Sequence, residues 1–176
     1  CNRADASLIS THLGMSIQIL DTTADYLARV RRLDSLANTL GDEASRSFRS
    51  LYLNLATLLE TYIDQHLGIA NRNWQSRREV CEKQLGVKLT DFRRWSVIDG
   101  IILIRNTIAH GNGRLTRLQL DRPLSTLNQI RTARGDVDAG DLVLTDASWH
   151  LAKEVSTEFL VWLDRMFRPM NGALDY

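Results

Sequence analysis

The spacing of apolar residues is the feature that most constrains the fold of this chain of 176 residues. Leucine, isoleucine, valine and aromatic side chains recur every three or four positions over most of its length, which is the period of an amphipathic α-helix. Only two prolines, Pro123 and Pro169, interrupt the pattern. A chain of this length buries roughly 70% of its unfolded surface, so one core suffices. We therefore expect a single all-α domain that covers residues 1–176.

Glycines and short polar residues mark where the helices begin and end. The pattern predicts helices over 5–40 (as one helix or two stacked ones), from Asp42 to Gly68, over 74–85, from Thr90 or Asp91 to Gly111, over about 123–134, and from Asp146 to just before Pro169. Residues 136–145 place Gly140 between short apolar runs, which predicts a small hairpin. The expected fold is an up-and-down helical bundle with a small irregular or hairpin insertion before the last helix.

The net charge of +1 hides a basic middle segment. Residues 72–134 contain 13 basic and 5 acidic side chains, a net charge of +8, whereas residues 1–71 carry −2 and residues 135–176 carry −5. Arginine supplies 19 of the 22 cations, and its guanidinium binds phosphate through two parallel hydrogen bonds. The middle segment is therefore compatible with an RNA-binding surface whose affinity falls as salt rises.

One short segment, from Ile104 to Gly113, carries residues suited to chemistry. Arg105 follows four apolar residues at the end of a predicted buried helix, so its charge needs an anionic or carbonyl partner. His110 can both take and give a proton near pH 7. Residues five apart on a helix are separated by about 140° around its axis. Either His110 lies just beyond the helix end, or a second copy of the chain completes the pair.

The sequence Arg105-Asn106-x-x-x-His110 followed by Gly111 resembles the Arg-x4–6-His motif of the HEPN superfamily (higher eukaryotes and prokaryotes nucleotide-binding). The resemblance implies an α-helical, metal-independent endoribonuclease that acts as a dimer. Toxins, abortive-infection proteins and CRISPR-linked nucleases belong to that superfamily. Members that partner minimal nucleotidyltransferases carry a Tyr two residues after the His. Asn112 stands there in this chain, which argues against that particular antitoxin arrangement.

The resemblance also implies catalytic roles. A ribose 2′-OH attacks the adjacent phosphorus and leaves a 2′,3′-cyclic phosphate and a 5′-OH. His110 moves the proton, Arg105 stabilises the charge on the phosphorane, and Asn106 orients His110 or the phosphate. Because the chain contains one such motif, the paired site of the family requires a homodimer. The expected partners are an RNA substrate and a cognate antitoxin or defence complex, in the cytoplasm.

Other polar residues offer weaker indications. Glu60 would orient an arginine if it faced the site, although an exposed acid is the simpler expectation. The pairs Arg77-Arg78 and Arg93-Arg94 are minor candidates for RNA contact, and the four tryptophans are expected in the core or at an interface rather than as platforms for bases. Five arginines after the motif are candidate phosphate contacts or simply solvated surface: Arg114, Arg117, Arg122, Arg131 and Arg134.

The sequence predicts no cofactor, no catalytic metal and no membrane span. Asp136, Asp138 and Asp141 suggest a calcium loop, but Ala147 stands where that loop needs its twelfth-position glutamate. The two cysteines cannot form a disulfide framework, which favours a reducing compartment. An alternative function from another class remains, a non-catalytic helical module for dimerisation or for nucleotide or RNA binding within a larger machine.

Overall fold

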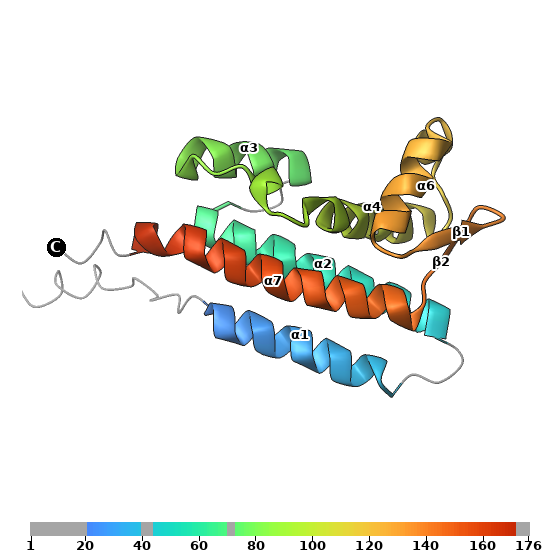
Figure 1. Ribbon diagram of the computed structural model, residues 1–176, viewed down its shortest axis with the longest axis horizontal. Helices are drawn as coiled ribbons and strands as arrows, with labels where there is room; N and C mark the ends of the chain where they lie inside the picture. Colours follow the sequence, from blue (N-terminus) through green and yellow to red (C-terminus); the bar gives the residue numbers. More distant parts are fainter. Residues whose placement is uncertain (1–20, 40–43, 70–72, 172–176) are drawn as a thin grey trace, which may run out of the picture.

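A computed structural model describes residues 21–39, 44–69 and 73–171 of the chain (Figure 1). The first part of the helix expected over 5–40, with Gly41 and the Asp42 cap, lies outside these ranges. The elements in chain order are α1 (Thr23–Ala37), α2 (Ala44–Leu67), α3 (Trp74–Leu85), a 3-10 turn (Leu89–Asp91), α4 (Trp95–Gly111), α5 (Arg117–Leu120), α6 (Pro123–Thr132), β1 (Asp136–Asp138), β2 (Asp141–Val143) and α7 (Asp146–Asn171). The prediction of an all-α bundle with a small hairpin before its last helix is confirmed.

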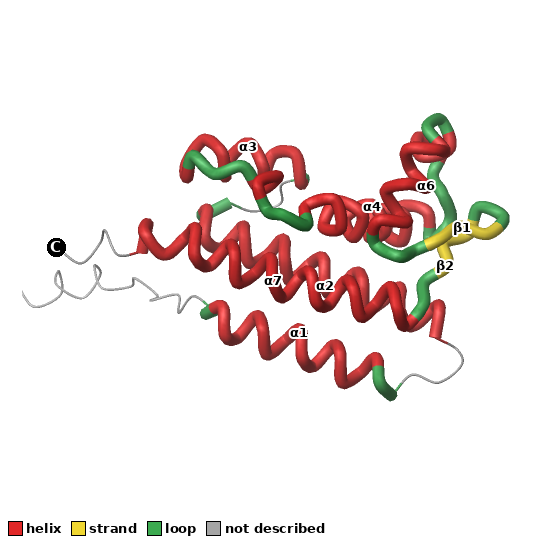
Figure 2. The backbone as a smooth tube through the Cα atoms, in the orientation of Figure 1, coloured by secondary structure: helices red, strands yellow, loops and turns green. Residues whose placement is uncertain are grey.

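The long helices form an up-and-down bundle with α2 at its centre. Helices α1 and α7 pack against α2 and against each other, and α4 packs against α2 and α7. In Figure 1, α1 and α4 run in one direction along the molecule, whereas α2 and α7 run in the opposite direction. Helix α3 contacts α2, and α6 packs along α4 beside the antiparallel β1–β2 hairpin, which lies at one end of the bundle (Figure 2).

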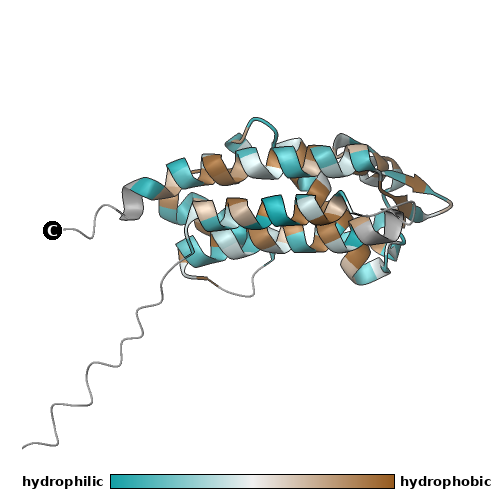
Figure 3. Cartoon of the chain, turned by 90° about the horizontal axis from the view of Figure 1, so that it is seen from below, coloured by the Kyte–Doolittle hydropathy of each residue, from teal (hydrophilic) through white to brown (hydrophobic). Residues whose placement is uncertain are grey.

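Each long helix buries one face and exposes the other, so apolar and polar residues alternate along the helices in Figure 3. The largest fully buried side chains include Trp149, Tyr26, Tyr52 and Phe159. The Tyr52 hydroxyl donates a hydrogen bond of 2.8 Å to the Ser148 carbonyl, which satisfies a polar group inside this core. Among the described residues, no helix is both long and apolar enough to cross a membrane.

The start of α4 differs from the prediction. Neither Thr90 nor Asp91 caps it, because both belong to the 3-10 turn and the helix begins only at Trp95. Phe92 has an extended backbone instead and buries its ring against α7, with ring centroids 5.1 Å from Phe159 and 5.7 Å from Trp162. Packing of this one aromatic side chain therefore overrides the local capping signal.

Two further boundaries also differ. Helix α7 is capped by Thr145 rather than Asp146, because the Thr145 hydroxyl accepts from the Ser148 amide at 3.3 Å and the Ser148 hydroxyl accepts from the Thr145 amide at 2.6 Å. It also continues past Pro169 to Asn171, although the sequence predicts an end before the proline. Pro169 lies in the last turn, so the backbone donor that it lacks is lost only at the very end of the helix. The short helix α5 has no counterpart among the sequence predictions.

Candidate functional site

Arg105, Asn106 and His110 all line one pocket of about 480 Å³. Helix α4 carries these three residues, and the remaining walls come from α2, from the beginning of α3 and from α5. The three residues of the motif therefore face a common space within a single chain.

The geometry of α4 explains how residues five positions apart share this pocket. Asn106 and His110 are four positions apart, so they lie on the same face of the helix. Arg105 starts from a neighbouring face, but its long side chain turns back, and Nη1 donates a hydrogen bond of 3.0 Å to Asn106 Oδ1. His110 belongs to the last turn, before the left-handed cap at Asn112. Of the two alternatives that the spacing left open, the one that places His110 beyond the helix end is therefore wrong.

The partner that Arg105 requires is Glu60 on α2. Arg105 Nη2 lies 3.4 Å from Glu60 Oε2, and the other Glu60 oxygen lies 3.7 Å from Arg77 Nη1. Arg77 in turn donates two hydrogen bonds to Asp64, at 2.7 and 2.6 Å. We call this alternating series Arg105–Glu60–Arg77–Asp64 the ion chain. The Glu60 side chain is only 13% exposed, so the simpler expectation of a solvated acid is wrong.

Arg105 and His110 keep hydrogen-bonding groups with which the polar side of the pocket can bind an anion. The Arg105 side chain is 27% exposed and uses one Nη1 and one Nη2 contact, so further guanidinium N–H groups remain for a ligand. His110 is exposed and forms no side-chain hydrogen bond with any residue in the described part of the chain. The pocket is therefore lined by the Arg105 guanidinium, which Glu60 and Asn106 hold, and by the His110 imidazole, which has no side-chain partner among the described residues. This pair suits phosphate binding and proton transfer.

Two polar residues that sequence reasoning missed hold the pocket wall and the end of α4. Gln119 on α5 is buried and donates a hydrogen bond of 2.6 Å to the Thr107 hydroxyl on α4. Its oxygen accepts from the Thr116 amide at 2.8 Å, and the spacing Thr116-x-x-Gln119 of a capping box was the available signal. Arg49 on α2 donates to the Asn112 carbonyl at 3.1 Å, for which the sequence offers no signal.

None of the five arginines predicted to contact RNA lines this pocket. Arg114 pairs with Asp141 at 3.4 Å and lines a separate hollow, and Arg131 pairs with Asp136 at 3.2 Å. Arg117, Arg122 and Arg134 are exposed and form no ion pair with another residue that the structure describes. These five side chains are therefore not part of the pocket wall, although Arg117 stands in sequence between Thr116 and Leu118, which line it.

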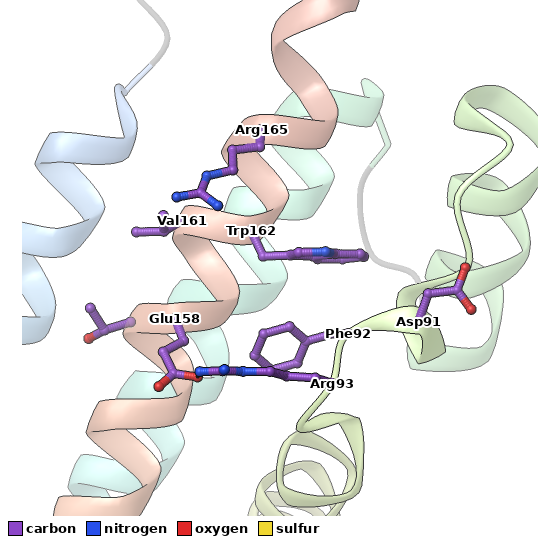
Figure 4. Close-up of a pocket in the computed structure, with 8 residues that line it drawn as sticks. Asp91, Phe92, Arg93, Glu158, Val161, Trp162 and Arg165 are labelled. Carbon is purple, nitrogen blue, oxygen red and sulfur yellow. The ribbon is translucent and has the colours of Figure 1, made fainter.

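The fold also neutralises much of the basic middle segment. Six of its arginines pair with acidic residues of the two flanking segments: Arg77, Arg93, Arg94, Arg105, Arg114 and Arg131. One of these pairs borders a second hollow of about 580 Å³ between the 3-10 turn and α7 (Figure 4). There Arg93 lies 3.1 Å from Glu158, and the Phe92 ring lies between Arg93 and Trp162. This second hollow contains none of the predicted catalytic residues.

Within residues 21–39, 44–69 and 73–171, no group of three or more His, Cys, Asp or Glu side chains is arranged to hold a metal ion. Comparisons of the chain with models of known protein families, with curated proteins and with solved structures found no significant match.

Proposed function

We propose that this protein is a metal-independent endoribonuclease of the HEPN type, in which Arg105 and His110 act on one phosphate of an RNA strand. The observation that supports the proposal is their common pocket, where Glu60 and Asn106 hold the Arg105 guanidinium and His110 is free of side-chain partners among the described residues. The motif that resembles the HEPN superfamily is the second support.

The proposed reaction needs only groups that the pocket and the substrate supply. The ribose 2′-OH loses its proton and attacks the neighbouring phosphorus, and the bond from phosphorus to the 5′ oxygen of the next nucleotide breaks. His110 takes the proton from the 2′-OH and delivers it to the leaving 5′ oxygen, Arg105 stabilises the extra negative charge of the phosphorane, and Asn106 orients Arg105 through their hydrogen bond. The products are a 2′,3′-cyclic phosphate and a 5′-OH, and DNA is spared because it has no 2′-OH.

Cleavage of a labelled RNA in EDTA tests this proposal. Replacing His110 with Ala is expected to slow cleavage by about 100- to 10,000-fold, the range for a lost general acid–base. Replacing Arg105 with Ala is expected to slow it by about 100- to 1,000-fold, as for a lost oxyanion donor. His150→Ala and Arg168→Ala are matched controls, because both residues are exposed on α7 outside the pocket. Activity that survives both pocket substitutions refutes the proposal.

We further propose that two copies of the chain form one composite site, as the resemblance to the HEPN superfamily suggests. Arg105→Ala and His110→Ala proteins are each expected to be inactive alone. Mixed dimers that carry one intact Arg105 and one intact His110 should regain part of the activity. A mixture that stays inactive, although labelled copies exchange on size-exclusion chromatography, contradicts the composite site and leaves the ribonuclease proposal to its own test.

A ribonuclease of this type would harm the cell that makes it unless a partner held it inactive. We propose a toxin, abortive-infection or other defence role in the cytoplasm, with a cognate antitoxin or defence complex as partner. Expression of the wild type should then stop growth, and His110→Ala should relieve that arrest. RNA binding without cleavage, unchanged by His110→Ala, supports instead the non-catalytic module for dimerisation or nucleotide or RNA binding.

A further inference from the structure

We infer that the same pocket carries a base-binding subsite, in which Trp74 stacks against an unpaired base of single-stranded RNA. This inference rests on the proposed function, because it specifies the substrate that the Arg105 site would accept. Trp74 is partly buried and packs against the core, as the sequence predicts for the tryptophans, and the inference adds a role in substrate binding.

The pocket has two chemically different sides. Arg105, Asn106 and His110 form the polar side, whereas Trp74, Leu103 and Leu118 supply apolar surface to the same space. The Leu118 side chain is 82% exposed and puts apolar surface at the pocket edge. A nucleotide joins an anionic phosphate to a flat apolar base, and a volume of about 480 Å³ is in the range of small-molecule sites.

The Trp74 indole is held in place from within the protein. The Arg77 guanidinium carbon lies 5.7 Å from the centroid of the ring, and Trp95 packs against it edge-on at 6.4 Å. Arg77 is itself fixed by the two hydrogen bonds to Asp64. The ion chain therefore connects both sides of the pocket, because Arg105 lies on the polar side and Arg77, which shares Glu60 with it, lies beside Trp74. A ring positioned in advance loses little entropy when a base stacks on it.

Asn73, at the edge of the pocket, adds one polar group to the apolar side. Its Oδ1 accepts a hydrogen bond of 2.8 Å from the Ser76 amide at the start of α3, so its NH2 group remains available to donate. Each of the four bases offers an acceptor to one such donor, and stacking tolerates any base. We therefore expect weak base preference but strong preference for unpaired RNA, since a base in a duplex must first leave its stack.

Binding of an RNA that cannot be cleaved tests the subsite apart from catalysis. The probe is a labelled oligonucleotide with 2′-O-methyl groups throughout, single-stranded or annealed to its complement, measured by fluorescence anisotropy. Trp74→Leu is expected to weaken single-strand binding by about 5- to 100-fold, the loss typical of one base–aromatic stack. Trp74→Phe keeps a ring and should retain most of the affinity. Trp162→Leu, in the hollow of Figure 4, is the tryptophan control.

A second pair of variants avoids any effect on the core. Leu118 lines the pocket and Leu124 does not, although both are leucines more than 70% exposed. Leu118→Asp places an acid beside the bound strand and should weaken binding by at least about fivefold, because it replaces apolar contact with charge repulsion. Leu124→Asp should leave the affinity unchanged.

The outcomes separate this inference from the proposed function. If wild-type protein cleaves RNA but Trp74→Leu and Leu118→Asp bind as wild type does, or if duplex binds as tightly as single strand, the subsite is refuted and the ribonuclease stands. If the wild-type protein binds single-stranded RNA without cleaving it, and the two variants lose that binding, the subsite stands and the catalytic proposal fails. For an active enzyme, Trp74→Leu should raise KM and largely spare kcat.

Discussion

Replacing Asp64 with Asn tests the ion chain most directly. Asp64 accepts two hydrogen bonds from Arg77, whose side chain is only 5% exposed. An asparagine of the same size keeps one acceptor oxygen and removes the negative charge. The substitution thus leaves a buried guanidinium with incomplete compensation and little change in packing volume.

The magnitude follows from how buried the pair is and from what remains. Removing one partner of a buried ion pair costs about 3–5 kcal/mol. Here Asp64 is 16% exposed, and Glu60 stays within 3.7 Å of Arg77 as a second acid, so part of the charge remains compensated. We expect Asp64→Asn to lower the free energy of unfolding by about 2–3 kcal/mol. As Glu60 shifts toward Arg77, its contact with Arg105 should weaken as well.

Urea unfolding with a double-mutant cycle measures this expectation. Combining Asp64→Asn with Arg77→Met removes both charges, so the double variant should be more stable than the sum of the single losses predicts, by about 1–2 kcal/mol. Glu82→Gln is the control, because the Glu82–Lys88 pair is more than half exposed and should contribute little. A loss for Asp64→Asn as small as that for Glu82→Gln, or strict additivity with Arg77→Met, refutes the reasoning.

Two substitutions at the α4–α6 contact extend these tests. Gly100→Ala should destabilise the fold by about 1–3 kcal/mol, because the added Cβ would lie 2.6 Å from the Gln129 carbonyl oxygen; a gain in the urea midpoint, as in an exposed helix, contradicts this close approach. Burial raises the pKa of the Asp99 carboxyl, against the opposing effects of Arg78 and the Gln129 hydrogen bond. A group whose pKa is raised by folding contributes stability at low pH, and this contribution is lost as the pH rises through the folded pKa. The free energy of unfolding of Asp99→Asn should therefore increase relative to that of the wild type as the pH rises from 3.8 toward neutrality. Urea unfolding across that range measures the gap, and a gap independent of pH contradicts the assignment.

Elements whose signals are local in sequence were predictable. Helix α3 covers 74–85 and ends at Gly86 in the left-handed conformation, as expected from its terminal glycine. Pro123 begins α6, and the hairpin turns at Gly140, which has a positive φ. These features depend on a residue and its nearest neighbours, so one sequence suffices to predict them. The start of α4 was not predictable, because Phe92 packs against residues of α7 far along the chain.

The sequence by itself determined the helical period, the all-α class and the placement of Arg105, Asn106 and His110 near one helix end. Only the tertiary structure decided what surrounds them. It brought Glu60 to Arg105 across 45 positions of sequence, fixed Arg77 on Asp64 and placed Trp74 at the same pocket. It also paired six arginines of the basic segment with acids of the flanks, which no count of charges along the chain reveals. The physical reason is that helical periodicity depends on neighbouring residues, whereas ion pairs and pockets depend on how whole helices pack.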